Sequence, residues 1–387
     1  MHLILCAEES EAELQVELAQ SFPGVRAQTS HPLLFEVEAA LSGSGPWPHL
    51  VFARQWLPDA RPARSESIRG WAGVLGEAVA GVLRDDHPWA LHVEPHYGVR
   101  QTHHIGARAW HSATRKGNPP PVAPRPEPGP PGVEAEAGRQ RSRLIREAFL
   151  ELLKKKRRHL LRRLRAEPAR FTPNDSLVQL LLTAPDCGYL SLAPAPLPFD
   201  QRHLVSPFPK GEVPVVSDKS APSRAFAKLA EAQRRLGRSI RVSETCVDLG
   251  ASPGSWTWLA LQHGARVVAI DRSPLRDDLM RDPRVEFQPG DAFRFQPPRP
   301  VDWLLCDILA APERAADLLL EWARHGWCRQ FVVTLKLGDA PGTEALTRLK
   351  RELAPLTREF FLTRLCANKK EVCAVGVLQP VGLEVPT

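Results

Sequence analysis

The sequence contains no long hydrophobic run. In 387 residues, no apolar stretch approaches the roughly 18 residues that a membrane-spanning helix needs. The amino-terminal run HLILC is followed at once by the acidic stretch AEESEAEL, which is not the pattern of a secretory signal. We therefore expect a cytoplasmic protein without a membrane partner.

Cysteine is also scarce and irregularly spaced. The seven cysteines form no C-x-x-C pair, and an odd number does not suit a disulfide framework. Reduced thiols are expected, and no metal site is expected. The neighbouring His103 and His104 do not change this, because two adjacent histidines fall short of a zinc ligand set.

Positive charge, in contrast, is concentrated in one segment. The whole chain has a formal net charge of +7, whereas Arg139–Arg165 alone carries 12 Lys and Arg against two Glu. Its apolar residues recur at helical spacing, which predicts a helix with a basic face. A solvated face or a membrane-surface helix would show a similar pattern, but the charge density favours binding to a phosphate backbone. The residues expected to contact this backbone are Lys154, Lys155, Lys156, Arg157, Arg158, Arg162 and Arg163.

Composition divides the chain into four regions. Residues 1–110 alternate strand-like and helix-like runs, which predicts an α+β domain. Residues 111–136 include eight prolines between Pro119 and Pro131 and are predicted to be an extended or disordered linker. Residues 137–212 combine the basic helix with two strand-like runs. Residues 213–380 alternate strands and helices and end in two strand-like runs, which predicts a doubly wound α/β sheet with a closing hairpin.

The stretch Thr245–Ser255, TCVDLGASPGS, organises the last region. It consists of a short apolar strand, a glycine-rich turn and the start of a helix, an arrangement that places backbone N–H groups beside the carboxyl end of a strand. A second strand, RVVAI, ends on Asp271, whose carboxylate is well placed to hold a ribose. This combination predicts a nucleoside-containing cofactor but does not identify it.

Other polar residues follow or close the predicted strands. Asp291 lies in the turn after the third strand, Asp307 follows VDWLLC, and Lys336 closes QFVVTLKL. Since the carboxyl ends of parallel strands share one edge of a sheet, we expect these side chains to face the same crevice as Asp271.

This layout resembles the class I S-adenosylmethionine-dependent methyltransferases, and among them the FtsJ-like ribosomal RNA 2′-O-methyltransferases, which carry a Lys–Asp–Lys–Glu tetrad. The segments APSRAFAKLAEA, CDILAAP, TLKL and KKEVCAV place that tetrad at Lys228, Asp307, Lys336 and Glu371. The turn DLGA-PG-WT, the segment GWCR and the run FARQW are similar to the bacterial RlmM type, which methylates a cytidine of large-subunit ribosomal RNA. The resemblance is dense over residues 217–378 and patchy over residues 1–216.

The resemblance implies a Rossmann-like methyltransferase domain preceded by an α+β, THUMP or ferredoxin-like RNA-binding region. It also implies S-adenosylmethionine as cofactor, ribosomal RNA as partner and a monomeric enzyme without metal. Lys336 would accept the proton of a ribose 2′-hydroxyl, while Lys228 and Glu371 would orient the reacting groups. The cofactor-binding residues implied are Ser223, Gly250, Ser252, Pro253, Gly254, Ser255, Trp256, Asp271, Asp291 and Asp307.

Absent residues narrow the chemistry further. No (D/N)PP(Y/F) motif follows VDWLLC, which argues against methylation of an adenine amino group. Cys306 is expected to be a buried strand residue and not a nucleophile.

Two alternatives remain at this stage. One is an RNA-binding assembly factor whose methyltransferase fold binds cofactor but is inactive, and the other is a 2′-O-methyltransferase of another RNA. The chain differs from its relatives at GDAPGTE after LKL, at Ala310–Ala311 and at Ala367–Lys370. These differences border the expected RNA-facing side and leave the target nucleotide open.

Overall fold

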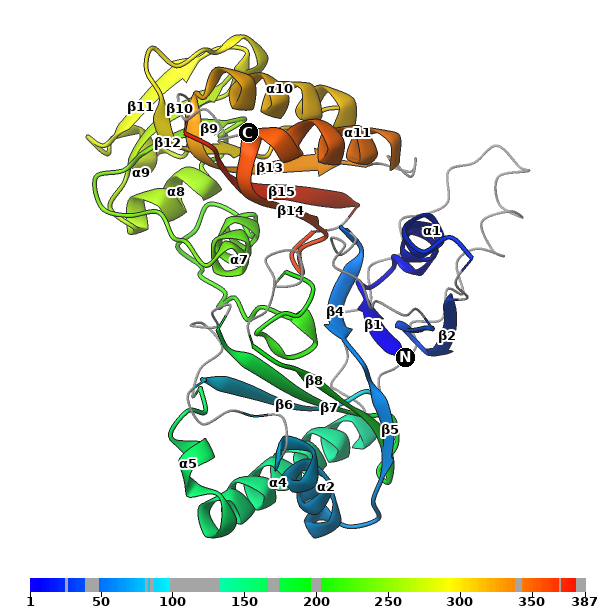
Figure 1. Ribbon diagram of the computed structural model, residues 1–387. Helices are drawn as coiled ribbons and strands as arrows, with labels where there is room; N and C mark the ends of the chain where they lie inside the picture. The colour runs from blue at the N-terminus through cyan, green and yellow to red at the C-terminus, as the bar shows by residue number, and fades with distance from the viewer. Residues whose placement is uncertain are drawn as a thin grey trace, which may run out of the picture.

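The structure is a computed structural model, and its description covers residues 1–24, 27–38, 49–80, 83, 87–97, 133–165, 174–195, 203–337, 343–368 and 370–380. These residues form three β-sheets with their covering helices (Figure 1). His103, His104 and residues 111–132 of the predicted linker lie outside the described residues, whereas residues 133–136 already belong to a helix, so the linker prediction extends four residues too far.

The first sheet contains the amino terminus. Its elements are β1 (His2–Cys6), α1 (Glu11–Ser21), β2 (Ala27–His31), β3 (Leu34–Val37) and β4 (Ala53–Leu57). The strand order is β2-β3-β1-β4, and every neighbouring pair is antiparallel. The apolar run of β1 is buried throughout, and Leu14 and Leu18 of α1 join the same core.

The second sheet joins two segments that are far apart in the sequence. Its elements are β5 (Arg61–Arg64), α2 (Ile68–Ala80), β6 (Trp89–Pro95), α4 (Val133–Lys156), α5 (Arg158–Leu161), β7 (Ser176–Leu182) and β8 (Cys187–Ala193). The strand order is β5-β8-β7-β6, with β6 and β7 parallel. The structure therefore differs from the predicted division at residue 110. The backbone of β6 finds its ladder partner in β7, so residues 61–95 belong with residues 133–193 and not with β1–β4.

The basic helix is shorter than its apolar stripe predicts. α4 ends at Lys156, and Arg157, with φ −149°, separates it from α5. The side chains of Ile145, Phe149 and Leu153 are fully buried, as expected, whereas Leu144 is 38% exposed. The pattern of Arg139–Arg165 also predicts Arg146 on the basic face, but its guanidinium donates a hydrogen bond to the carbonyl of Leu91, so the prediction is wrong for this residue. The packing of α4 against α2 and β6 sets which face is buried.

The third sheet is the largest. Its strands are β9 (Thr245–Leu249), β10 (Arg266–Asp271), β11 (Val285–Pro289), β12 (Val301–Cys306), β13 (Cys328–Lys336), β14 (Thr357–Thr363) and β15 (Glu371–Leu378). Its α-helices are α7 (Phe226–Leu236), α8 (Ser255–Gln262), α9 (Asp277–Met280), α10 (Pro312–His325) and α11 (Thr343–Leu353). Short 3-10 turns span Pro209–Gly211, Ala292–Arg294 and Ala354–Leu356.

The strand order of this sheet confirms the predicted doubly wound architecture. The order is β11-β10-β9-β12-β13-β15-β14, and the first five strands are parallel. In chain order these five read 3-2-1-4-5, as in dinucleotide-binding folds. β15 is antiparallel to both neighbours and forms the predicted closing hairpin with β14.

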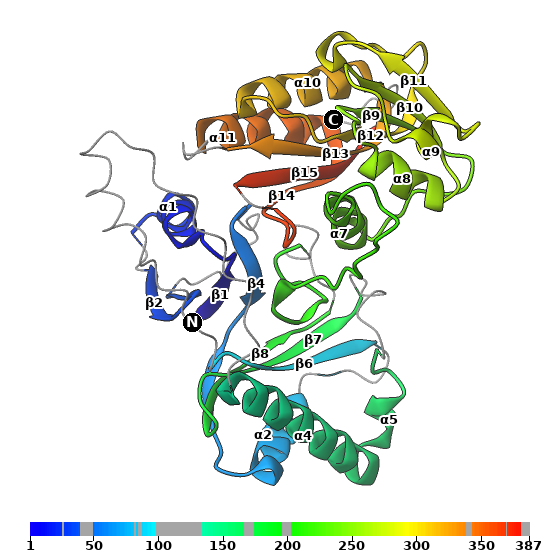
Figure 2. The same ribbon diagram turned by 180° about the vertical axis from the view of Figure 1, so that it is seen from behind.

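The two faces of this sheet are covered by different helices (Figures 1 and 2). Because neighbouring strand residues point to opposite faces, Leu304 packs in the core shared with α10 and α11, whereas Leu305 packs in the core shared with α7 and α8. The apolar faces of these amphipathic helices thus fix the sheet between two layers.

The amino-terminal sheet packs against the β14–β15 hairpin and α11. Lys350 of α11 lies 3.1 Å from the Glu17 carboxylate of α1 and donates to the carbonyl of His49. The backbone N–H of Arg364, just after β14, donates to the carbonyl of Val51. In the described part of the chain, no helix has both the length and the apolar character to cross a membrane.

Candidate active site

The sheet topology brings the four predicted tetrad residues together. Lys336 and Glu371 are register partners at the ends of the antiparallel strands β13 and β15. Asp307 directly follows β12, the parallel neighbour of β13 on its other side. Lys228 lies in the first turn of α7, a helix that packs against β15.

The four charged groups form a closed ring. Lys336 Nζ lies 2.6 Å from Asp307 Oδ1 and 3.0 Å from Glu371 Oε2. Lys228 Nζ lies 3.1 Å from Asp307 Oδ2 and also pairs with Glu371 Oε1. The four side chains are 10–19% exposed, so each ammonium contacts both carboxylates in a site largely screened from solvent.

This pairing determines the charge states in the ring. Burial lowers the pKa of Lys336, but the charges of Asp307 and Glu371 and the hydrogen bonds to them outweigh burial and raise that pKa above its usual range. Burial raises the pKa of Glu371, but its contacts with Lys228 and Lys336 outweigh that effect and lower it. At neutral pH the resting site therefore holds a protonated Lys336 beside an ionised Glu371.

The glycine-rich turn after β9 lies directly against the tetrad. Gly250 has φ +75°, and a Cβ added there would lie 2.6 Å from Ile308 Cγ1, one residue beyond Asp307. Gly254 has φ +107°, and a Cβ there would overlap Leu279 of α9. Glycine is therefore required at both positions, and the turn brings the start of α8 beside the chemical site.

The other predicted cofactor residues surround this turn. The Asp271 carboxylate accepts hydrogen bonds from the backbone N–H groups of Ser252, at 3.0 Å, and Ser273, at 2.9 Å. The Ser223 and Ser255 hydroxyls lie 2.7 Å apart, which connects the segment before α7 to the first residue of α8. A partly exposed carboxylate at the end of β10 is suited to bind vicinal hydroxyls.

The remaining predicted cofactor residues continue the same edge. Trp256 donates through its indole N–H to the carbonyl of Ala225. Pro253 lies within the turn, between Ser252 and Gly254. Asp291 lies 3.3 Å from the Arg272 guanidinium and accepts from the Phe293 N–H; the Phe293 hydrogen bond and the arginine charge lower the pKa of its carboxyl. All the predicted residues thus lie along one edge of the large sheet.

Sequence reasoning missed Asp248, the buried carboxyl within β9. It accepts a hydrogen bond of 2.7 Å from the Thr257 hydroxyl of α8, which holds the two ends of the glycine turn together. Burial raises its pKa to about 7, the hydrogen bonds from Thr257 oppose this, and the charges of Asp307 and Asp271 add to it. An acidic residue inside an otherwise apolar strand was the available signal.

Cys306 is buried in β12, and burial raises the pKa of its thiol to about 12. This agrees with the prediction that it is not a nucleophile. Among the described residues, no group of three or more His, Cys, Asp or Glu side chains is placed to hold a metal ion.

The predicted RNA-contacting residues lie on the second sheet's helical layer, apart from the tetrad in the fold (Figure 1). Most are exposed, and Arg157 is partly buried and donates to the carbonyl of Ala80. Lys154 pairs with Glu151 at 2.5 Å on the helix surface. An exposed basic surface thus runs along the end of α4 and α5.

Comparison with known proteins agrees with this geometry. A sequence model of the FtsJ-like methyltransferase family matches residues 221–346. Two proteins named ribosomal RNA large subunit methyltransferase M are similar to this chain. The one from Thauera aminoaromatica is 39% identical over 202 residues, 49% of this chain and 56% of that protein. The one from Azoarcus sp. (strain BH72) is 44% identical over 185 residues, 45% of this chain and 51% of that protein.

The chain thus spans about half the length of these curated relatives, with 56% and 51% of their lengths covered. Among solved structures, the 1,6-didemethyltoxoflavin-N1-methyltransferase of Burkholderia thailandensis has 18% identity and a TM-score of 0.31, over 41% of this chain and 80% of that one, a likeness too slight to inform function. The sequence matches confirm the predicted resemblance to FtsJ-like and RlmM-type methyltransferases. Residues 221–346, which include Lys228, Asp307 and Lys336, are similar to the FtsJ-like methyltransferases, and Glu371 follows in β15 of the same sheet.

Proposed function

We propose that this chain transfers a methyl group from S-adenosylmethionine to a ribose 2′-hydroxyl of RNA, most specifically a cytidine of large-subunit ribosomal RNA. The observation that carries the proposal is the closed ring of Lys228, Asp307, Lys336 and Glu371 beside a glycine turn. The large-subunit ribosomal RNA named for the relatives supports this choice of substrate.

The residues present fit S-adenosylmethionine. The Asp271 carboxylate suits ribose hydroxyls, the turn at Gly250–Gly254 presents backbone N–H groups, and Asp307 lies next to that turn. When bound, the cofactor supplies an electrophilic methyl group on a sulfonium whose positive charge favours loss of a proton nearby. Ser223, Ser255, Trp256 and Asp291 would line the same site.

Lys336 is proposed as the group that accepts the hydroxyl proton. A ribose hydroxyl is a poor nucleophile until its proton begins to leave, so a positioned base is required. Asp307 and Glu371 hold the Lys336 amine in one place but also favour its charged form. The neutral amine is therefore the minor, reactive form, and Lys228 keeps the two carboxylates in position. Much of the rate gain would come from holding hydroxyl, base and methyl donor in line.

The amino-terminal part is proposed to bind the RNA. Its first sheet, with the order β2-β3-β1-β4 and α1 connecting β1 to β2, is consistent with a ferredoxin-like unit. We propose that the second sheet with its basic helices is the THUMP-like part and that Lys154–Arg158, Arg162 and Arg163 contact phosphates. A monomer acting in the cytoplasm completes the proposal.

The test uses full-length chain, S-adenosylmethionine labelled in the methyl group, and large-subunit ribosomal RNA transcribed in vitro without modifications. We expect one labelled ribose, located by resistance of its 3′ linkage to alkaline hydrolysis, and no label on small-subunit RNA or transfer RNA. Label on a base, or cofactor binding without transfer to any RNA, would contradict the proposal. The second outcome would favour an RNA-binding assembly factor.

A further inference from the structure

The loop between β14 and β15 leads directly into the tetrad residue Glu371, and groups outside the tetrad hold it. At its start, the Arg364 guanidinium donates to the carbonyl of Glu9, in the amino-terminal sheet's unit. Near its end, the Asn368 side-chain amide donates to the carbonyl of Glu371. The position of the Glu371 carboxylate therefore depends on how this loop is fixed.

The central anchor of the loop is Glu231. Its carboxylate, 1% exposed, accepts the backbone N–H of Cys366 at 2.8 Å. Glu231 lies three residues after Lys228 on α7, and residues at this spacing share one helix face. One buried side chain thus connects the helix that carries Lys228 to the loop that carries Glu371.

Two arginines compensate the buried charge of Glu231. Arg235, on the next turn of α7, donates through Nε at 2.8 Å. Arg54, from β4 of the amino-terminal sheet, places Nη1 3.8 Å from Glu231 Oε1 and 2.7 Å from Cys366 Sγ. A buried carboxylate needs such partners, because an unpaired charge there is strongly unfavourable.

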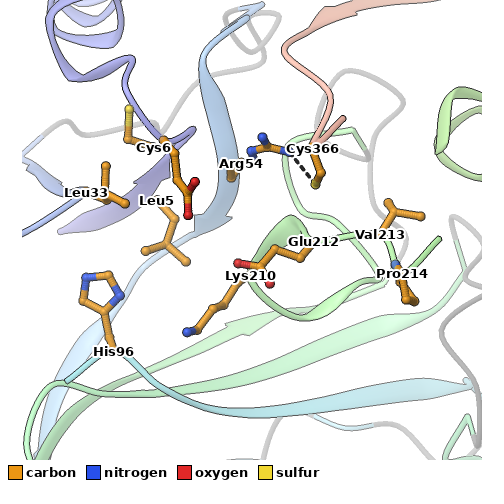
Figure 3. A pocket seen from close by; sticks show the side chains of 11 residues that line it. Leu5, Cys6, Leu33, Arg54, His96, Lys210, Glu212, Val213, Pro214 and Cys366 are labelled. Carbon is orange, nitrogen blue, oxygen red and sulfur yellow. Dashed lines mark hydrogen bonds between the residues drawn. The ribbon is translucent and has the colours of Figure 1, made fainter. Parts of the chain in front are cut away.

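The backbone of Arg54 is itself closely packed against Gly211. Gly211 has φ +70°, and a Cβ added there would overlap the carbonyl of Arg54. Arg54, Cys366 and Lys210 line a cavity of about 440 Å³ between the amino-terminal unit, the segment 210–214 and the Cys366 loop, and Figure 3 shows the Arg54–Cys366 contact on its wall. Arg54 therefore bridges two units of the fold at one defined point.

We propose that Arg54 and Glu231 are positioning residues for methyl transfer: docking of the amino-terminal unit through Arg54 fixes the Cys366 loop and thereby the distance between Glu371 and Lys228. The polar contacts of both residues lead to this loop and to Arg235, so both act on the tetrad through the loop. The catalytic part of this inference rests on the proposed function.

The test compares Arg54→Ala and Glu231→Gln with Lys350→Ala. Lys350 also joins the amino-terminal unit to the large sheet, but it does so through Glu17 and His49, away from the Cys366 loop. We expect Arg54→Ala and Glu231→Gln to lower kcat about tenfold to a hundredfold, the scale of a small misplacement of reacting groups. KM for S-adenosylmethionine should be unchanged, Arg54→Lys should recover part of kcat, and Lys350→Ala should leave kcat unchanged.

A second measurement does not depend on activity. Hydrogen exchange of the peptide containing Cys366 should become faster in Arg54→Ala and Glu231→Gln but not in Lys350→Ala. Equal effects of all three variants on kcat, or unchanged exchange in the loop, would overturn the inference and leave a general docking role. A wild-type chain that transfers no methyl group would overturn the proposed function, and the exchange measurement would still decide whether Arg54 and Glu231 hold the loop.

Discussion

The ammonium of Lys336 and the carboxylate of Glu371 lie 3.0 Å apart because the two residues are register partners on antiparallel strands. The pairing of the two strands therefore places these residues opposite each other, whatever rotamers their side chains adopt. Asp307 completes the environment from the other neighbouring strand, so the proposed base is oriented by residues on both sides.

Replacing Lys336 by Ala should abolish methyl transfer but leave cofactor binding. Loss of a positioned general base lowers the rate by about 10²- to 10⁴-fold. The substitution does not change the glycine turn or Asp271, so the affinity for the cofactor should be kept. Single-turnover transfer to ribosomal RNA and calorimetric titration with S-adenosylhomocysteine measure the two effects. Lys219→Ala, at an exposed lysine before α7, is the matched control and should transfer normally. Transfer that survives in Lys336→Ala would mean that another group is the base.

The rate of the chemical step should rise with pH. Because Asp307 and Glu371 outweigh burial and raise the pKa of Lys336, its neutral form is a small fraction at neutral pH and grows about tenfold per pH unit. Single-turnover rates should therefore increase with a slope near one from about pH 7 upward. Glu371→Gln removes one of the charges that raise this pKa, so its slower rate should level off at a lower pH than that of the wild type. A flat profile in the wild type would contradict the assignment of Lys336.

Asp248 should make the protein less stable as pH rises from about 4 to about 7. Its folded-state pKa is about 7, above the ordinary value of 3.8, so its stabilising contribution is complete below the unfolded pKa and is lost as pH rises through the folded one. The loss amounts to about 1.4 kcal/mol per pH unit within that window. Asp248→Asn keeps an acceptor for Thr257 without the charge. Urea unfolding at pH 5 and pH 8 should show the variant gaining more stability relative to the wild type at pH 8 than at pH 5, because most of the window between the two pKa values lies above pH 5. An equal difference at both pH values would contradict this.

Gly254→Ala should weaken cofactor binding, whereas Gly237→Ala should not. Both glycines have positive φ, so alanine is strained at either position by about 1 kcal/mol. At Gly254 the added methyl group meets a neighbour, Leu279, while at Gly237 no described residue lies within 4 Å of it. We expect similar small losses of stability from φ alone, and an additional loss of stability and cofactor affinity in Gly254→Ala. Equal cofactor affinity in the two variants would place the cofactor elsewhere.

Neutralising the basic surface should weaken RNA binding and its dependence on salt. Removing one phosphate contact makes the slope of log K against log salt shallower by about 0.7 to 0.9. The double variant Lys155→Gln with Lys156→Gln removes two such contacts, so its slope of log K against log salt should be shallower by nearly twice that amount. The control pair, Arg324→Gln with Arg351→Gln, removes two exposed charges from α10 and α11. Filter binding at several salt concentrations measures both, and identical slopes in the two double variants would exclude this surface from RNA contact.

The large sheet and the tetrad could be predicted from the sequence for a physical reason. Alternation of apolar strands with amphipathic helices fixes a doubly wound sheet, and such a sheet gathers the residues at its strand ends. Asp307 and Lys336 could therefore be placed together before the structure. The contact of Lys228 with them depends on how α7 packs, and only the resemblance pointed to it.

What the sequence did not reveal depends on long-range packing. Arg146 lies in the same basic, helical sequence pattern as its exposed neighbours. Its guanidinium nevertheless donates to the carbonyl of Leu91 and so does not belong to the exposed basic face. The strand β5, Arg61–Arg64, contains Pro62 and charged residues, and it forms only because an edge strand tolerates them beside β8. Arg54 lies in the run FARQW and Glu231 in the segment APSRAFAKLAEA, but neither segment indicates that the two side chains meet, because their contact exists only once the units have docked.

The parallel pairing of β6 with β7 has a consequence for synthesis of the chain on the ribosome. Residues 89–95 cannot complete their ladder until residue 182 has been made, so β6 is synthesised well before β7, the strand it pairs with. Proteolytic cleavage between the two segments would likewise leave neither piece with a complete sheet. An amino-terminal fragment ending near residue 110 should consequently aggregate or recruit chaperones, whereas a fragment reaching residue 195 contains every strand that this layer uses.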